Sequence, residues 1–216
     1  MLALTIINRY FPQFKDNKYL QREWFIIYQT TYAMCVLSYC MYVLLNYFMY
    51  RDVQIIKSIF VVIKNYVLLD MLICEKYDAY LHHITTFIIC YISIGNDVLF
   101  EQLIHFYIVA TMTEISTVFL TIRDIIKPYR QLHFVKKAYD INNLLFATTF
   151  YYTRWYLFFR YGICDKDNFE NIRNNVSTYQ YYILCNCIYS IFALNIYWGI
   201  LIGKILIYQK YKKNNA

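Results

Sequence analysis

Ionisable side chains inside otherwise apolar stretches are the residues of this chain best suited to do chemistry. Two adjacent histidines, His82 and His83, open the run "HHITTFIICYISI" (82–94), and Asp70 lies near the end of the preceding apolar run. Histidine titrates near neutral pH, so it serves as a general base, a nucleophile or a metal ligand. A charged group within a bilayer is costly and usually faces a protein interior or a wet hollow. We therefore treat these three residues as a candidate site.

Four further ionisable residues lie in apolar runs and extend this site: Lys64, His105, Glu114 and Arg154. At 1.5 Å of rise per helical residue, the histidines lie roughly 5 Å inside the bilayer boundary and Asp70 lies at a similar depth. Glu114 lies about 12 Å inside, and Arg154 is nearer the middle. The estimated depths of Glu114 and Arg154 differ by about 9 Å, a long distance for an ion pair unless the arginine side chain extends along its helix.

The spacing of the histidines separates their possible roles. Residues i and i+1 point about 100° apart on a helix, so His82 and His83 do not form the i,i+4 pair of a helical metal site. His105 and Glu114 are the obvious residues to complete one, and we expect no metal. Asp78, four residues before His82, is placed to orient its imidazole. Two alternatives stay open: one histidine serves the site, or both only bond across helices and lock them together.

The elements that must position these residues are membrane-spanning helices. Hydrophobic residues make up 60% of the 216-residue chain and charged residues only 16%, which excludes a soluble domain. A bilayer core of about 30 Å requires roughly 20 helical residues, and the backbone must satisfy its own hydrogen bonds there. The sequence predicts an all-α protein, one domain over residues 1–216, with six spans at residues 24–50, 53–74, 79–94, 98–122, 140–163 and 180–208.

Lysine and arginine between the predicted spans set the orientation, because cytosolic loops retain them. Thirteen lie on the side of the two termini and three lie in the opposite loops. Both termini are therefore predicted to be cytosolic. The net charge of +7 reflects this distribution, so we expect membrane lipids as partners and no nucleic acid. The oligomeric state is not predictable from these patterns.

The order of these motifs resembles the TLC-domain family, which includes the ceramide synthases. The matching stretches are "NYVLLD" (65–70), "YLHHITTFIICYIS" (80–93), "TEISTVFLTIRD" (113–124) and "FATTFYYTRWYLFFRYGI" (146–163). The resemblance implies an endoplasmic-reticulum-type membrane and six helices around a central cavity that holds lipid. In ceramide synthases the histidine pair serves N-acylation of a sphingoid base by acyl-CoA without a metal, together with later aspartates. Here "HFYIVATMTEISTVFL" (105–120) stands in place of those aspartates and resembles the other branch of the family.

These observations lead to a functional expectation and a rival. We expect a lipid-metabolism protein that binds or acylates a lipid, with His82 or His83 as base or transient acyl acceptor and Asp70 and Glu114 as supporting catalytic residues. Lys64, His105 and Arg154 would supply polar groups to the cavity. No cofactor is expected, and acyl-CoA is the possible co-substrate. The rival is a non-enzymatic protein that binds lipid, regulates membrane composition or escorts cargo, and the missing aspartates favour it. A channel or transporter is the least favoured class, since no inverted repeat is present.

Overall fold

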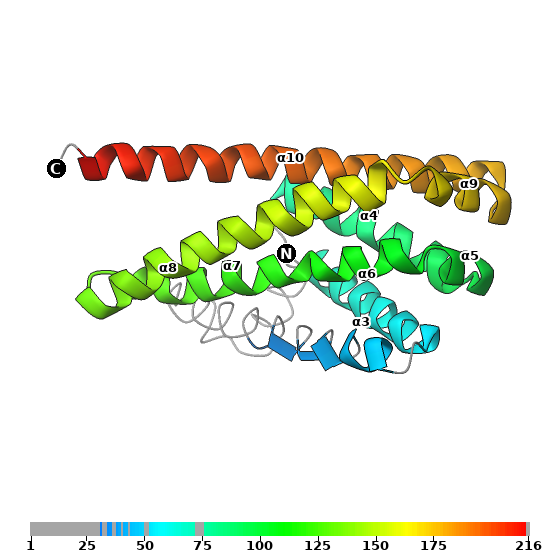
Figure 1. Cartoon of the computed structure of the whole chain (residues 1–216), viewed down its shortest axis with the longest axis horizontal. Helices are drawn as coiled ribbons and strands as arrows, with labels where there is room; N and C mark the ends of the chain where they lie inside the picture. The colour runs from blue at the N-terminus through cyan, green and yellow to red at the C-terminus, as the bar shows by residue number, and fades with distance from the viewer. Residues whose placement is uncertain are drawn as a thin grey trace, which may run out of the picture.

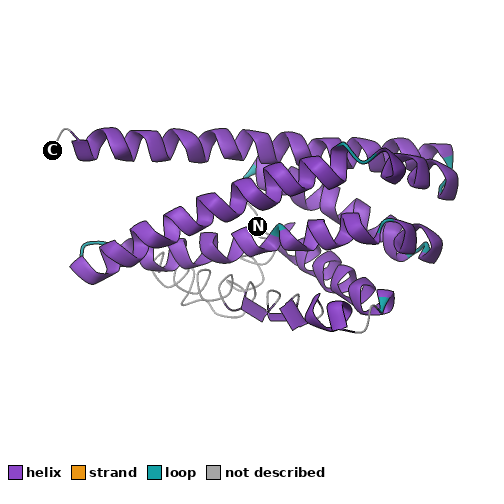
Figure 2. Cartoon of the chain, in the orientation of Figure 1, coloured by secondary structure: helices purple, strands orange, loops and turns teal. Residues whose placement is uncertain are grey.

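The computed structural model describes residues 52–71 and 76–214, together with residues 31, 34–35, 38–39, 41–42 and 44–49; side chains are described up to Ile207. Across these residues the chain forms helices joined by loops and turns, without a β-strand (Figure 2). The predicted all-α class is therefore confirmed for the described part of the chain. Most of the predicted span 24–50 lies outside the described residues.

The elements carry the labels of Figure 1. In chain order they are α3 (Val53–Met71), α4 (Tyr77–Ile94), α5 (Asp97–Gln102), α6 (Ile104–Met112), α7 (Glu114–Ile126), the 3-10 turn η2 (Lys127–Tyr129), α8 (His133–Phe150), the π-helical segments η3 (Tyr151–Leu157) and η4 (Phe159–Ile163), α9 (Lys166–Asn175) and α10 (Thr178–Asn214). The second, third and sixth predicted spans coincide with α3, α4 and α10. The fourth is divided among α5, α6 and α7, and the fifth covers the end of α8 and both π-helical segments.

Two described stretches are long and apolar enough to cross a membrane, Ile104–Tyr129 and Thr178–Ile207. They coincide with the fourth and sixth predicted spans. The predicted number of six transmembrane helices is not confirmed, because polar residues reduce the apolar character of the others. Helix α3 carries two lysines and an aspartate, and α4 carries the histidine pair with Asp78.

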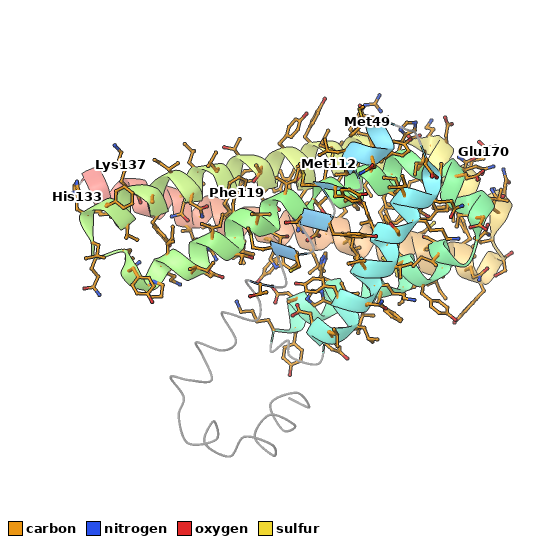
Figure 3. All side chains as sticks on the ribbon, turned by 90° about the horizontal axis from the view of Figure 1, so that it is seen from below. Met49, Met112, Phe119, His133, Lys137 and Glu170 are labelled. Carbon is orange, nitrogen blue, oxygen red and sulfur yellow. The ribbon has the colours of Figure 1, made fainter. Side chains whose placement is uncertain are left out.

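Helix α10 runs along the whole length of the molecule, and its C-terminal end lies at the same end of the molecule as the turn that joins α7 to α8 (Figure 1). Helices α5 and α9 lie at the opposite end. Figure 3 shows the same polarity, with His133 and Lys137 of α8 at one end and Glu170 of α9 at the other. At 1.5 Å per residue, the 37 residues of α10 extend roughly 55 Å, so this helix is longer than a bilayer core of about 30 Å.

The end formed by α5 and α9 is held by side-chain amides. Asn96 caps α5 by accepting a hydrogen bond from the Leu99 amide at 3.0 Å, and its own Nδ2 donates to the Asn175 carbonyl at 2.8 Å. Asn175 in turn donates to Gln102 Oε1 at 2.6 Å. These bonds join the two helix ends across 79 residues of sequence and fix the position at which α10 begins.

An aromatic core fills the interior near this end. It consists of Phe60, Phe100, Phe106, Tyr107 and Phe158, which contact one another with ring centroids 4.5–5.8 Å apart, mostly edge to face. All five side chains are buried. The core joins α3, α5, α6 and the π-helical region.

Helix α4 packs against both α3 and α10, and α7 packs against α8. The polar residues singled out from the sequence lie at these interfaces. The packing of these helices therefore determines which of the polar residues contact one another.

Candidate functional site

Asp70 and His83 form the first contact of the candidate site. Asp70 lies in the last turn of α3 and His83 in the second turn of α4, and each residue is 9% exposed. His83 Nε2 lies 2.7 Å from Asp70 Oδ2. A carboxylate only accepts hydrogen bonds, so Nε2 is the donor, and in the neutral imidazole the opposite nitrogen, Nδ1, then keeps its lone pair. The structure thus joins the two residues that the sequence placed at similar depth.

The free nitrogen of His83 has a counterpart on its neighbour. The Nδ1 atoms of His82 and His83 are both buried and have no hydrogen-bond partner among the described residues. The two rings lie 5.5 Å apart, and the ring of Tyr66 meets His83 edge-on at 6.2 Å. A buried polar atom without a partner costs about 1–3 kcal/mol, so two such atoms on adjacent residues require an explanation.

His82 faces α10. Its ring meets the Trp198 indole edge-on, with the centroids 5.4 Å apart. Trp198 Nε1 donates to Asp78 Oδ2 at 2.7 Å. The expectation that Asp78 orients His82 is therefore wrong: α4 begins early enough, at Tyr77, but the carboxylate of Asp78 accepts a hydrogen bond from the indole across 120 residues.

Arg154 connects three elements from within η3. It is 6% exposed and donates from Nε to Ser116 Oγ at 2.9 Å, from Nη2 to Thr117 Oγ1 at 3.1 Å, and from Nη1 to Asn195 Oδ1 at 3.4 Å. Glu114 Oε1 lies 3.9 Å from Nη2. The estimated 9 Å difference in depth is therefore overcome, because the long guanidinium side chain reaches along the interface and four partners on α7 and α10 receive it.

Three side chains of the π-helical segment η3 contact the surrounding helices. Besides Arg154, Trp155 Nε1 donates to the Asn195 carbonyl at 2.8 Å and the Tyr151 hydroxyl donates to the Gly199 carbonyl at 2.7 Å. The close approach requires glycine, because a Cβ at Gly199 would lie 2.5 Å from the Trp155 indole. Gly199 and Gly203 form a G-x-x-x-G pair on α10, a spacing that lets membrane helices approach closely. π-helical segments often mark functional sites.

Asn195 is a member of the site that the sequence reasoning missed. It is 1% exposed, and its Nδ2 is the third buried side-chain nitrogen without a partner among the described residues. One asparagine within the apolar stretch 188–202, one turn before a G-x-x-x-G pair, is the sequence signal that was available. We refer to Asp70, His82, His83, Arg154 and Asn195 together as the polar cluster.

The polar cluster has two halves, one with Asp70 and the histidine pair and one with Arg154 and Asn195, and the two halves lie close enough to interact. The positive charge of Arg154 acts on the imidazole of His82, which itself contacts His83. Asn195 and Trp198 are three residues apart on α10 and so lie on the same helix face. Asn195 contacts Arg154 and Trp198 contacts His82. The cluster is therefore continuous from α3 through α4 to α10 and η3.

The remaining predicted site residues lie at different distances from this cluster. Glu114 reaches it through Arg154. Lys64 is half-buried on α3 and lies within electrostatic range of Cys90, as does Glu114. His105 is exposed on α6, and the structure does not bring it to the histidine pair. Within the described part of the chain, no group of three or more His, Cys, Asp or Glu side chains is arranged to hold a metal ion.

The comparisons with known proteins address the chain as a whole. No curated protein and no solved structure matches it. The family comparison gives the TLC domain, which matches residues 4–204 and so covers nearly all of the 216 residues. The match includes every member of the polar cluster. The chain therefore belongs to the TLC-domain family of membrane proteins.

Proposed function

We propose that this protein transfers an acyl group from acyl-CoA to the amino or hydroxyl group of a long-chain lipid, with His83 as the general base. The observation that carries the proposal is the hydrogen bond between Asp70 and His83, which leaves a buried, unpartnered Nδ1. An imidazole held by a carboxylate at one nitrogen and free at the other is the arrangement that acyl-transfer enzymes use to activate a nucleophile.

The reaction follows from this arrangement. His83 Nδ1 takes the proton of the acceptor amine or hydroxyl as that group attacks the thioester carbonyl carbon. The new N–C or O–C bond forms, the C–S bond breaks, and the imidazolium returns the proton to the departing thiolate. Asp70 stabilises the imidazolium through Nε2 and holds the ring in one tautomer. General-base catalysis of this kind contributes about 10²–10⁴-fold to the rate.

The setting suits a lipid substrate. TLC-domain membership indicates a membrane protein associated with lipid metabolism, and Thr178–Ile207 is long and apolar enough to cross a membrane. Asn195 lies 17 residues beyond the first residue of α10, roughly 26 Å along the helix. This position is near the end of a bilayer core of about 30 Å, on the side where α10 ends.

A site at that depth is reached from the side where the basic residues gather. The α7–α8 turn and the C-terminal end of α10 lie at the same end of the molecule (Figure 1), and the sequence places the lysine and arginine excess there. We propose that this side is cytosolic, that the membrane is the endoplasmic reticulum or a related endomembrane, and that acyl-CoA enters from the cytosol. The lipid chains would occupy an interior cavity among the helices. Glu114, which lies 3.9 Å from Arg154, and Lys64 would meet the polar headgroup.

A single assay tests the proposal. Purified protein in lipid nanodiscs is given radiolabelled long-chain acyl-CoA with a long-chain base or a lysolipid, and labelled lipid product is measured. His83→Ala and Asp70→Asn are each expected to reduce the rate by about 10²–10⁴-fold. His133→Ala is the matched control, because His133 is exposed at the start of α8 and lies far from the cluster. Equal rates for wild type and His83→Ala would refute the enzymatic proposal.

The Arg154 network favours one other function. Because Ser116, Thr117, Asn195 and Glu114 already receive the guanidinium, this half of the site is complete without turnover. A protein that binds lipid, and so regulates membrane composition or escorts cargo, would need no more. Lipid that co-purifies chemically unchanged, with an identical amount bound to His83→Ala, would select this second function.

A further inference from the structure

The side-chain amide of Asn195 is held in one orientation. Arginine has five N–H donors and no acceptor, so only the amide oxygen of Asn195 is able to face it. Arg154 Nη1 lies 3.4 Å from that oxygen. The amide nitrogen therefore points away from the guanidinium and remains buried without a partner among the described residues. Arg154 thus orients the Asn195 amide so that its N–H donor faces away from the guanidinium.

The backbone around Asn195 is equally fixed. Trp155 Nε1 donates to the Asn195 carbonyl at 2.8 Å, and the Tyr151 hydroxyl donates to the carbonyl one turn later. On the same face of α10, three residues further on, Trp198 meets the ring of His82. Asn195 therefore lies on the same side of α10 as Trp198, which contacts His82 of α4.

The unpartnered atoms define what a ligand must supply. Asn195 Nδ2 is a donor and requires an acceptor, whereas His83 Nδ1 keeps its lone pair and requires a donor. Leaving such groups unpaired costs about 1–3 kcal/mol each, a cost that apolar residues of similar size would not incur. An acyl group and the group that attacks it together meet both needs: the acyl carbonyl oxygen accepts a hydrogen bond, and the attacking amine or hydroxyl donates one.

We infer that Asn195 Nδ2 donates a hydrogen bond to the carbonyl oxygen of the bound acyl group and holds the negative charge that develops there during transfer. This inference rests on the function proposed above and adds the carbonyl-binding donor to it. Arg154 acts as a positioning residue, because it fixes the orientation of the amide. The nearby guanidinium charge also favours an oxyanion at this point. Removal of one such donor lowers kcat by about 10²–10³-fold in acyl-transfer enzymes.

The variant that isolates the donor is Asn195→Asp. Aspartate keeps an oxygen for Arg154 and the shape of the side chain, so the helix contacts are retained while the donor is replaced by an acceptor. Asn186→Asp is the matched control, because Asn186 is exposed on the same helix and donates to the Tyr182 carbonyl one turn earlier. Asn195→Ala is measured in parallel, and thermal unfolding in detergent identifies any variant that does not fold.

Two measurements are made on these proteins. The first is infrared difference spectroscopy of palmitoyl-CoA labelled with ¹³C at the carbonyl, bound without an acceptor lipid. The carbonyl band of wild type is expected at lower wavenumber than that of Asn195→Asp, because a hydrogen bond weakens the C=O bond. The second is acyl transfer, in which Asn195→Asp is expected to lower kcat by about 10²–10³-fold and to leave KM nearly unchanged.

The two readouts separate the inference from the function on which it rests. A carbonyl band at the same position in wild type and Asn195→Asp, or a wild-type kcat in Asn195→Asp, overturns the inference even if His83→Ala abolishes transfer. A band that shifts in a protein without transfer activity supports the carbonyl site and refutes the enzymatic function. If palmitoyl-CoA does not bind wild type at all, both are overturned.

Discussion

The aromatic core and the polar cluster are both buried, yet they treat their polar atoms in opposite ways. In the aromatic core the Tyr107 hydroxyl donates to Ser93 Oγ at 2.7 Å, and Ser93 donates to the Ile89 carbonyl at 2.6 Å. Each donor in this series of two hydrogen bonds has an acceptor. In the polar cluster, Arg154 donates three hydrogen bonds, but three nitrogens of His82, His83 and Asn195 have no partner among the described residues.

This contrast separates polar groups that build the fold from those that are kept for another purpose. A satisfied buried polar group contributes to stability, whereas an unsatisfied one lowers it. Proteins break local rules of this kind mainly at functional sites. The contrast therefore predicts that removing a bonded polar group lowers stability in either region, whereas removing an unpartnered nitrogen of the polar cluster does not.

The largest expected effect is that of Arg154→Ala. The substitution removes the donor that Ser116, Thr117, Asn195 and Glu114 share, and it separates α7, η3 and α10. Breaking a buried charged network by removal of one partner costs about 3–5 kcal/mol. The free energy of unfolding in mixed detergent micelles, measured by titration with a denaturing detergent, should fall by this amount.

Arg154→Lys tests whether geometry or charge matters at this position. Lysine carries a point charge that cannot bond to several separate oxygens in the planar arrangement of a guanidinium. We expect it to recover only a minor part of the lost stability. Full recovery would show that the network depends on charge alone, and Arg154 would then not orient Asn195.

Gly199→Ala has the next largest expected effect. A Cβ at this position would lie 2.5 Å from the Trp155 indole, which cannot move freely because its Nε1 is bound to the Asn195 carbonyl. Overpacking of this kind costs about 1–3 kcal/mol. Gly95→Ala is the control, since the nearest atoms to its Cβ lie at 3.6 Å. Equal stability of both variants would mean that Trp155 of η3 does not pack tightly against Gly199 of α10.

The sequence predicted part of this site because helical geometry is regular within one element. The shared depth of Asp70 and the histidines follows from the rise of straight helices, and the structure places Asp70 and His83 in contact. The same estimate did not predict the contact between Glu114 and Arg154, because it counts only the rise of the backbone and not the reach of the long arginine side chain.

Contacts between helices that are distant in the sequence could not be predicted from the sequence pattern. The partner of Asp78 lies 120 residues away and that of Arg154 Nη1 lies 41 residues away. A carboxylate beside a histidine on one helix is a reasonable partner for it, but tertiary packing supplied a better donor in Trp198. Asn195 escaped notice for the same reason: one amide in an apolar helix acquires meaning only from the arginine that packs against it.

Tyr107→Phe measures the value of a satisfied bond in the aromatic core. The ring contacts are kept, and Ser93 still donates to the Ile89 carbonyl, so no buried donor is stranded. The expected loss of stability is about 1 kcal/mol, the net value of one hydrogen bond. Tyr91→Phe, on an exposed tyrosine of α4, should leave the unfolding free energy unchanged. A loss for Tyr91→Phe as large as that for Tyr107→Phe would show that burial of the bond is unimportant.

His82→Phe has the smallest expected effect and the opposite sign. Phenylalanine keeps a ring against Trp198 and removes the buried, unpartnered Nδ1. Since an unsatisfied group costs free energy in the folded state, stability should stay the same or rise by up to about 1 kcal/mol. The measurement is the same detergent titration, with Tyr107→Phe in parallel as the substitution of a satisfied group.

A loss of stability in His82→Phe comparable to that in Tyr107→Phe would break the contrast, because it would mean that Nδ1 is bonded in the ligand-free protein. Unchanged or increased stability of His82→Phe, together with loss of acyl transfer, would strengthen the contrast between bonded and unpartnered polar groups. A substitution that abolishes activity without lowering stability marks a residue that serves the reaction and not the fold. In that case the histidine pair would be retained for the reaction and the helix packing would be independent of it.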